Sequence, residues 1–160
     1  MRVDDQTSNR AAAAAHRPAA RAAFFLVLLP LISSAQGVTP SGLWKNIDDA
    51  TGKPRALIRV SETQGTLQGR IERVFLAPGE NPICVKCSGT KRNAPVIGLV
   101  ILDGLHKDGD EYVGGQILDP DSGKTYRCKV KLLDNGLKLS VRGYIGVPAL
   151  GRTQTWFREE

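Results

Sequence analysis

Short segments of alternating apolar and polar residues dominate the second half of the chain. Tyr126, Cys128 and Val130 share one face of such a segment, and an arginine and lysines occupy the other face. Alternation with a period of two is typical of half-buried strands. The breaks between segments, at 119–123 and 134–136, carry the Asp, Asn, Pro and Gly residues that turns require. The pattern therefore predicts an antiparallel meander over the C-terminal part of the chain.

The same alternation extends toward the N-terminus and predicts eight strands in all. The expected strands run from 42 to the turn at 48–52, and over 54–61, 66–75, 96–102, 111–118, 126–133, 137–145 and 152–158. A short helix over 102–106 is the alternative to the end of the fourth strand. Eight antiparallel strands in sequence order close most naturally into an up-and-down barrel, which leaves no exposed edge. A two-layer sandwich is the competing architecture, but it needs long crossovers, and only residues 77–95 could provide one.

The long connections of such a barrel would all lie at one end. Alternate connections share an end, which brings together 48–52, 77–95, 119–123 and 146–151 and leaves short turns at the other end. A barrel interior of this size is filled by side chains or holds one small ligand. Ligand sites favour barrel mouths, so the asymmetry predicts a binding site at the end with the long connections.

The first 35 residues have the composition of a secretory signal peptide. A basic, Ala-rich leader precedes an apolar run at 22–32, and small residues follow at 33–35. The apolar run is shorter than the roughly 20 residues that span a bilayer, although an uncleaved membrane anchor is the alternative. Cleavage would leave a single β-barrel domain at 36–160, periplasmic or secreted, without a stable membrane span.

Charge argues against a nucleic-acid partner. The formal charge of the whole chain is +6, and removal of four Arg and two Asp with residues 1–35 leaves 6 − (4 − 2) = +4. The excess is spread along the expected strands, without a basic run or interleaved aromatic residues.

Three cysteines lie in the expected domain. In an oxidising compartment Cys84 and Cys87 most simply form a disulfide, while a redox pair or half of a metal site are the alternatives. A redox pair of the thioredoxin type starts a helix, and no helical pattern follows here. A zinc site needs about four ligands, but Cys128 is expected in mid-barrel and His106 in a turn at the far end. We therefore expect a disulfide, a buried and inert Cys128 thiol, and no metal or other cofactor.

Residues near the ends of the expected barrel are candidates for two roles. Trp44 opens the first strand and Arg158 ends the last, so closure would stack the guanidinium on the indole and plug that end. Arg142, Tyr144 and Arg152 approach the mouth on the last two strands, where they could bind an anionic group. Parity places Arg142 on the outer face if its neighbours on the strand face inward. If Trp156 faces inward, Arg152 does too, and Trp156 completes the candidate ligand-binding set.

Several ordered motifs resemble a known family. They are Gly42-Leu43-Trp44, Cys84-x-x-Cys87, Gly115-x-Ile117-Leu118-Asp119-Pro120, Gly123-Lys124-x-Tyr126, Arg142-Gly143-Tyr144 and Gly151-Arg152-Thr153-Gln154-x-Trp156. Gly-x-Trp with a late Arg is similar to the calycin pattern of lipocalins and fatty-acid-binding proteins. More specifically, residues 42–158 resemble the secreted bacterial family called domain of unknown function 2147. The resemblance implies a lipocalin-like barrel exported to the cell envelope, and it implies no activity.

These observations favour a non-catalytic exported envelope protein, expected to be a monomer, that binds a small amphipathic or hydrophobic ligand at one barrel mouth. The alternative is a structural or protein-interaction module whose barrel is packed solid. A hydrolase using Asp119 or Asp121 is a third hypothesis, although a hairpin turn explains this pair more simply and no EF-hand spacing follows it. No Gly-x-Ser-x-Gly, Ser-His-Asp set or phosphate-binding loop is present, so we do not expect an enzyme.

Overall fold

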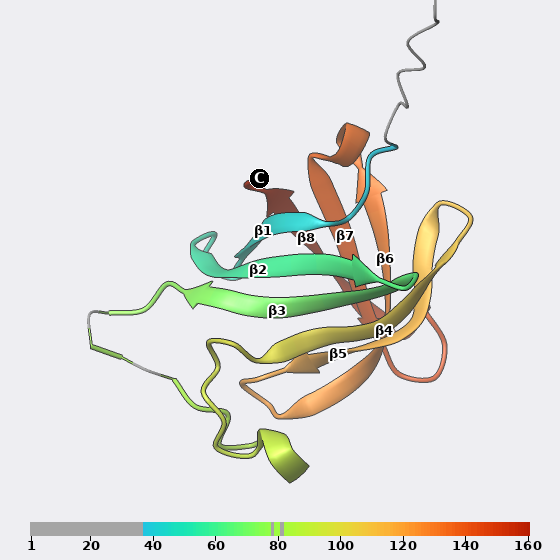
Figure 1. Cartoon of the computed structure of the whole chain (residues 1–160). Coiled ribbons are helices and arrows are strands. Elements are labelled where there is room, and N and C mark those ends of the chain that lie inside the picture. Colours follow the sequence, from blue (N-terminus) through green and yellow to red (C-terminus); the bar gives the residue numbers. More distant parts are fainter. Residues whose placement is uncertain (1–36, 78, 81) are drawn as a thin grey trace, which may run out of the picture. The chain divides into compact units, whose positions relative to one another are not determined.

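The protein forms a closed antiparallel β-barrel in a computed structural model, which describes residues 37–77, 79–80 and 82–160 (Figure 1). The expected signal peptide lies outside the described residues. The strands are β1 (Gly42–Ile47), β2 (Pro54–Thr63), β3 (Thr66–Val74), β4 (Val100–Asp108), β5 (Glu111–Asp119), β6 (Lys124–Leu133), β7 (Lys138–Tyr144) and β8 (Gly151–Arg158). Two short 3-10 turns, η1 (Gly89–Lys91) and η2 (Asp134–Gly136), complete the elements. No helix in the described ranges is both long and apolar enough to cross a membrane.

Each strand pairs with the next in sequence, and pairing of the first with the last closes the barrel. On β1, Trp44 lies opposite Arg158 and Asn46 opposite Trp156 on β8. Both edges of every strand are therefore paired. The predicted up-and-down barrel is confirmed, and the sandwich alternative is wrong.

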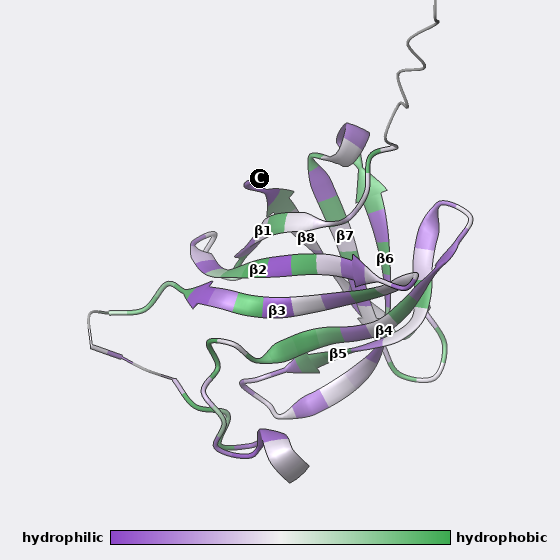
Figure 2. Ribbon diagram, viewed as in Figure 1, coloured by the Kyte–Doolittle hydropathy of each residue, from purple (hydrophilic) through white to green (hydrophobic). Residues whose placement is uncertain are grey.

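The interior is built from the alternate residues that the sequence pattern predicts. Val130 and Val141 are cross-strand partners, and each is 1% exposed. Figure 2 shows hydrophobic and hydrophilic residues alternating along β2. Gly115 allows a close approach between β4 and β5, because a Cβ atom there would overlap the backbone oxygen of Asp103. Burial of the apolar face on all eight strands provides the main driving force for folding.

The fourth strand departs from the expected boundaries. The sequence pattern predicts this strand over 96–102, but β4 begins at Val100 and continues to Asp108. Gly98 adopts φ +91°, a conformation that favours glycine, and so the chain bends just before the strand starts. His106 accordingly lies within β4 and not in a turn, and the alternative helix over 102–106 is also wrong.

The β3–β4 connection forms a flap that packs on the outside of the barrel wall (yellow-green, lower left in Figure 1). Ile117 faces the interior, so its neighbour Leu118 points outward, and yet Leu118 is only 5% exposed. It belongs to one core cluster with Cys84 and Cys87 of the flap. A backbone hydrogen bond from Val96 to Pro82 holds the two limbs of the flap together. The flap therefore has a small core of its own, continuous with the barrel.

Candidate functional site

The long connections meet at one end of the barrel, which we call the mouth. Strand order places there the β1–β2, β3–β4, β5–β6 and β7–β8 connections. Two contacts join the β5–β6 connection to parts of the mouth that are distant in sequence. The Cys84 sulfur lies 3.3 Å from the backbone oxygen of Pro120, and the carboxylate of Asp121 forms an ion pair with Arg55 on β2. The β5–β6 turn is thus held between the flap and β2.

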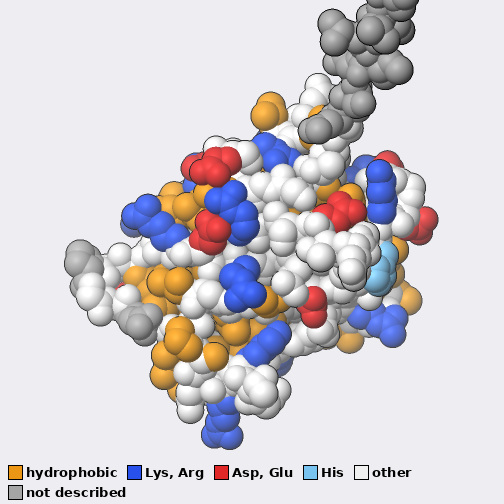
Figure 3. All heavy atoms as spheres, in the orientation of Figure 1, with side chains coloured by type: hydrophobic (Ala, Val, Ile, Leu, Met, Phe, Trp, Pro, Cys, Tyr) orange, Lys and Arg blue, Asp and Glu red, His pale blue; other side chains and the backbone are white. Residues whose placement is uncertain are grey.

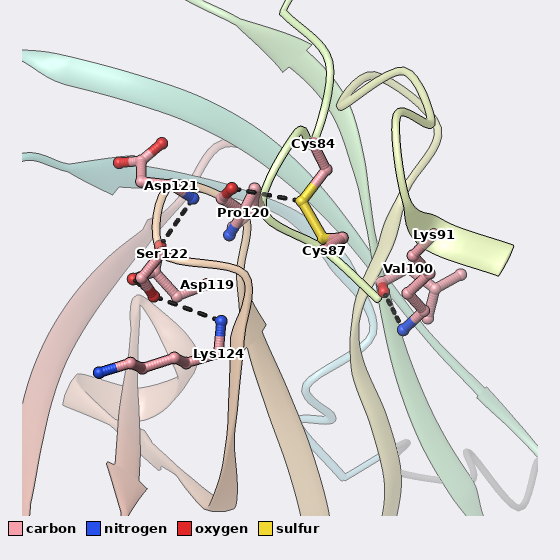
Figure 4. Close-up of a disulfide and its surroundings, with 9 residues drawn as sticks. All are labelled: Cys84, Cys87, Lys91, Val100, Asp119, Pro120, Asp121, Ser122 and Lys124. Carbon is pink, nitrogen blue, oxygen red and sulfur yellow. Dashed lines mark hydrogen bonds between the residues drawn. A yellow bond between two sulfur atoms is a disulfide. The ribbon is translucent and has the colours of Figure 1, made fainter. Parts of the chain in front are cut away.

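The flap is fastened by the predicted disulfide between Cys84 and Cys87 (Figure 4). Both cysteines are buried, with 0% and 4% exposure. The Cys84 amide donates to the backbone oxygen of Ala94 at 2.9 Å, which ties the bridge to the return limb of the flap. The disulfide is therefore a structural part of the mouth, as the sequence predicts.

The two aspartates of the β5–β6 turn are used in local structure. Asp119 accepts hydrogen bonds from the Asp121 amide at 3.1 Å and from the Ser122 hydroxyl at 2.6 Å. Figure 4 shows these residues in a tight turn beside the disulfide. Asp121 pairs with Arg55, and Asp48 lies 3.9 Å from the same guanidinium. Such geometry is that of a hairpin turn, which the sequence favours over a catalytic pair.

The barrel interior differs between its two halves. Toward the far end it is filled, because Leu67, Leu105 and Leu139 are each 0% exposed. Toward the mouth, Ile117 and Tyr126 are cross-strand partners that also face inward, but they are only half-buried. The inward-facing residues toward the mouth are therefore less completely buried than those at the far end, and we call this part of the interior the cup.

The floor of the cup carries polar groups. Asn46 is only 7% exposed, and its amide donates to the side-chain oxygen of Gln154 at 3.3 Å. Trp156 lies beside them and is 2% exposed. Among the residues that the structure describes, its Nε1 atom is the buried side-chain donor without a hydrogen-bond partner.

Arg152 lies near the mouth end of β8, two residues before Gln154 and four before Trp156. Its Nη2 atom is 2.5 Å from a carboxylate oxygen of Asp49 in the β1–β2 connection. The Arg152 side chain is 72% exposed, so this ion pair is open to solvent. Exposed pairs of this kind contribute about 0–1 kcal/mol to stability.

The other ligand-binding candidates lie elsewhere. Arg142 and Tyr144 face outward, on the opposite side of β7 from Val141. Arg142 donates to the backbone oxygens of Pro148 and Ala149, and so it fixes the β7–β8 connection against the outer wall. Trp156 is in the floor of the cup and not at its rim. The structure thus brings Arg152 and Trp156 to the same side of the barrel wall and leaves Arg142 and Tyr144 outside.

Three residues of the cup were missed in the sequence: Asn46, Gln154 and Tyr126. The available signal was strand alternation, because each of these residues lies two positions from an inward-facing residue: Trp44, Trp156 or Cys128. It did not reveal that Asn46 and Gln154 meet, because that contact depends on the register between the first and last strands.

The far end of the barrel is closed by the predicted Trp44–Arg158 contact. The guanidinium carbon lies 4.2 Å from the centre of the indole ring, and the Trp44 Nε1 donates to the backbone oxygen of Pro40 at 2.8 Å. Arg158 also donates to the backbone oxygens of Gly136, Ser41, Thr39 and Glu160. Burial lowers the pKa of Arg158, but these carbonyl groups and the indole face satisfy its donors.

A polar groove of about 500 Å³ runs over β4, β5 and β6, and Tyr126 of the cup is among the residues that line it. Asp103, Gln116, Thr125 and Arg127 line it, together with glycines of β4 and β5. No group of three or more His, Cys, Asp or Glu residues in the described ranges is arranged to hold a metal ion.

A closed, antiparallel eight-stranded barrel with consecutive strands paired is the architecture of the lipocalin-like, or calycin, class. Residues 42–158 match the family described as "Uncharacterized protein conserved in bacteria (DUF2147)", and the chain belongs to this family. A solved structure entitled "Protein HP1028 from the human pathogen Helicobacter pylori belongs to the lipocalin family" has the same fold. Its TM-score is 0.66 at 22% identity, over 77% of this chain and 84% of that chain. No curated protein matches the chain significantly.

Proposed function

We propose that this chain is an exported, non-catalytic protein of the bacterial envelope that binds a small amphipathic ligand in the cup. The observation that carries the proposal is the contrast between the two halves of the interior. Inward-facing Ile117 and Tyr126 are half-buried, whereas inward-facing leucines below them are fully buried. Apolar surface that faces the inside of a barrel and still contacts solvent is suited to the apolar part of a ligand.

The rim suits the polar part of the same ligand. The Arg152–Asp49 ion pair is exposed, so a carboxylate or phosphate of the ligand can take the place of Asp49. A guanidinium binds such groups through two parallel hydrogen bonds. The proposed ligand therefore has an apolar body of limited length, because the filled half of the barrel stops it, and an anionic group near the rim.

Export is supported by the leader and by the disulfide. Residues 1–35 have the order of basic, apolar and small residues that a signal peptide has. Disulfides persist in the periplasm and outside the cell, and are rare in the cytosol. The sequence of the N-terminus of the protein isolated from the envelope tests this part, with Gln36 expected as the first residue.

Calorimetric titration of the processed protein with dodecanoate tests ligand binding. We expect Tyr126→Ala to weaken binding about tenfold, which corresponds to about 1.4 kcal/mol of lost apolar contact. Arg152→Gln is expected to weaken it several-fold. Arg127→Gln is the matched control, since Arg127 neighbours Tyr126 on β6 but is exposed on the outer face. Unchanged affinity in Tyr126→Ala, or the absence of any binding, would contradict the proposal.

The alternative is an interaction module with no small ligand. Exposed apolar side chains on the connections at the mouth favour it, including Val85, Ile145 and Leu150 at 63%, 67% and 70% exposure. Figure 3 shows hydrophobic side chains gathered at the lower left, where Figure 1 draws the flap. This alternative predicts that the protein isolated from the envelope has the mass of the bare chain in native mass spectrometry. It also predicts a protein partner that Val85→Asp releases.

A further inference from the structure

The two tryptophans of the barrel interior differ in the state of their indole nitrogens. Trp44 is 0% exposed, and its Nε1 is paired with a backbone oxygen. Trp156 is 2% exposed, and its Nε1 has no partner within the described part of the chain. Buried polar groups in folded proteins nearly always have a hydrogen-bond partner, and a buried indole N–H usually finds one. The Trp156 donor therefore requires an acceptor that the described chain does not supply.

The neighbours of Trp156 form a patch of further donors. Asn46 is directly opposite Trp156 across the β1–β8 pairing, and Gln154 is the preceding inward-facing residue on β8. Their mutual hydrogen bond uses one Asn46 hydrogen and the Gln154 oxygen. The Gln154 amide hydrogens and the second Asn46 hydrogen remain for another acceptor. Three side chains thus offer neutral N–H donors on one part of an otherwise apolar inner wall.

The chemistry of the patch selects the kind of acceptor. Indole and amide donors carry no formal charge, and Arg152, the next inward-facing residue on β8, is engaged at the rim with Asp49. Burying an anion without a paired cation is far more costly than burying a neutral oxygen that accepts hydrogen bonds. A carbonyl, ester or hydroxyl oxygen therefore suits the floor, and an anionic group suits the rim.

We infer that Trp156, Asn46 and Gln154 form a subsite at the floor of the cup for a neutral oxygen acceptor at the inner end of the ligand. This inference rests on the proposed function and deepens it. The ligand class becomes an amphiphile that carries a carbonyl, ester or hydroxyl oxygen at the end that enters the barrel. A simple hydrocarbon tail would leave the Trp156 donor unpaired.

Nuclear magnetic resonance of the ¹⁵N-labelled protein tests the subsite, because each indole N–H gives a separate signal. Three eight-carbon probes are compared: 2-octanone, which only accepts hydrogen bonds, octylammonium, which only donates, and octanoate, which is anionic. We expect 2-octanone to move the Trp156 Nε1–H signal downfield and to slow its exchange with water. Octylammonium and octanoate are expected to leave that signal in place. The Trp44 signal is the internal control and should not move with any probe.

Variants separate the subsite from the cup as a whole. Trp156→Phe assigns the signal, and Gln154→Leu, which retains the side-chain volume, is expected to weaken binding of 2-octanone about three- to tenfold. If 2-octanone shifts the signals of Ile117 and Tyr126 but not that of Trp156, the subsite is disproved while the proposed function stands. If no probe shifts any of these signals, both fail. Persistent contact of the Trp156 N–H with one slowly exchanging water in the presence of 2-octanone would also overturn the subsite.

Discussion

The closed end and the mouth of this barrel each contain a tryptophan and an arginine, but the hydrogen-bond partners of these residues differ. At the closed end, Arg158 donates to backbone oxygens and stacks on Trp44, so the end is sealed by satisfied groups. At the mouth, Arg152 on the same strand pairs with one exposed carboxylate, and the indole nitrogen of Trp156 has no partner in the described chain. The polar groups of the closed end are therefore paired, whereas the mouth side has a buried donor without a partner among the described residues. The comparison predicts that substitutions at the closed end lower the free energy of unfolding more than substitutions at the mouth do.

The largest expected loss of stability comes from removing the Trp44 side chain at the closed end. Trp44→Ala should lower the free energy of unfolding by about 3–5 kcal/mol, because a fully buried ring is replaced by a cavity. Tyr126→Ala at the mouth should cost less than half as much, since Tyr126 is only half-buried. Urea unfolding followed by circular dichroism measures both values. Equal losses would show that the two ends do not differ in packing.

The two arginines of β8 give the next comparison. Arg158→Gln should lower the free energy of unfolding by about 3 kcal/mol, because hydrogen bonds to several backbone oxygens and the indole contact are lost together. Arg152→Gln should change it by less than about 1 kcal/mol, since its ion pair is exposed. The same denaturant titration applies. A cost for Arg152→Gln as large as that for Arg158→Gln would contradict the comparison.

We expect the disulfide to stabilise the mouth more than the closed end. Replacing both Cys84 and Cys87 by Ser should cost about 2 kcal/mol, the loop-closure entropy for a four-residue loop. The flap should become sensitive to limited proteolysis, while amide exchange in β1 and β8 stays slow. Wild-type protein reduced with a phosphine is the matched control and should behave in the same way. Faster exchange in β1 would mean that the disulfide supports the closed end as well.

The smallest effect is expected for a thiol reagent acting at neutral pH on Cys128, which lies on β6 between the two ends of the barrel. Burial raises the pKa of its thiol from 9.0 to about 12. The thiol should therefore not react with a disulfide reagent at neutral pH in the folded protein and should react at once after unfolding. Rapid reaction in the folded state would show that the cup extends deeper than Tyr126.

The same pKa shift predicts how stability changes at alkaline pH. The contribution of the neutral thiol is fully present below pH 9 and is lost as the pH rises from about 9 to about 12, because the unfolded chain ionises first. The difference in unfolding free energy between wild type and Cys128→Ala isolates this term from the other titrating groups. A difference that does not change across this range would contradict the assignment.

Most of the fold could be predicted because local alternation and turn residues were consistent with each other. The strands from β5 to β8 were identified by period-two alternation and by the Asp, Asn and Gly residues between them. The start of β4 was not predicted correctly, because Val96 and Leu99 have the apolar character of strand residues. They are instead buried in the flap, before the strand begins. Burial in a flap and burial in a strand produce the same apolar pattern.

The candidate site was predicted less completely for a physical reason. Alternation along β8 alone places Arg152 on the inward-facing side of the strand, and the sequence therefore identified Arg152 as a candidate. The Asn46–Gln154 contact and the unpaired Trp156 donor depend on how β1 and β8 are aligned, and neither strand specifies that register alone. The outward position of Arg142 and Tyr144 was consistent with parity, but their place near the mouth in sequence favoured a binding role.

Closure between β1 and β8 also has a consequence for biosynthesis. The two strands that seal the barrel are the first and the last to be synthesised, and their contacts join Trp44 to Arg158 at opposite ends of the domain. Contacts so distant in sequence form only after most of the chain is available, and they make folding slow. A nascent chain that still lacks its last strand cannot complete the barrel, so the closed fold forms only after β8 has been synthesised.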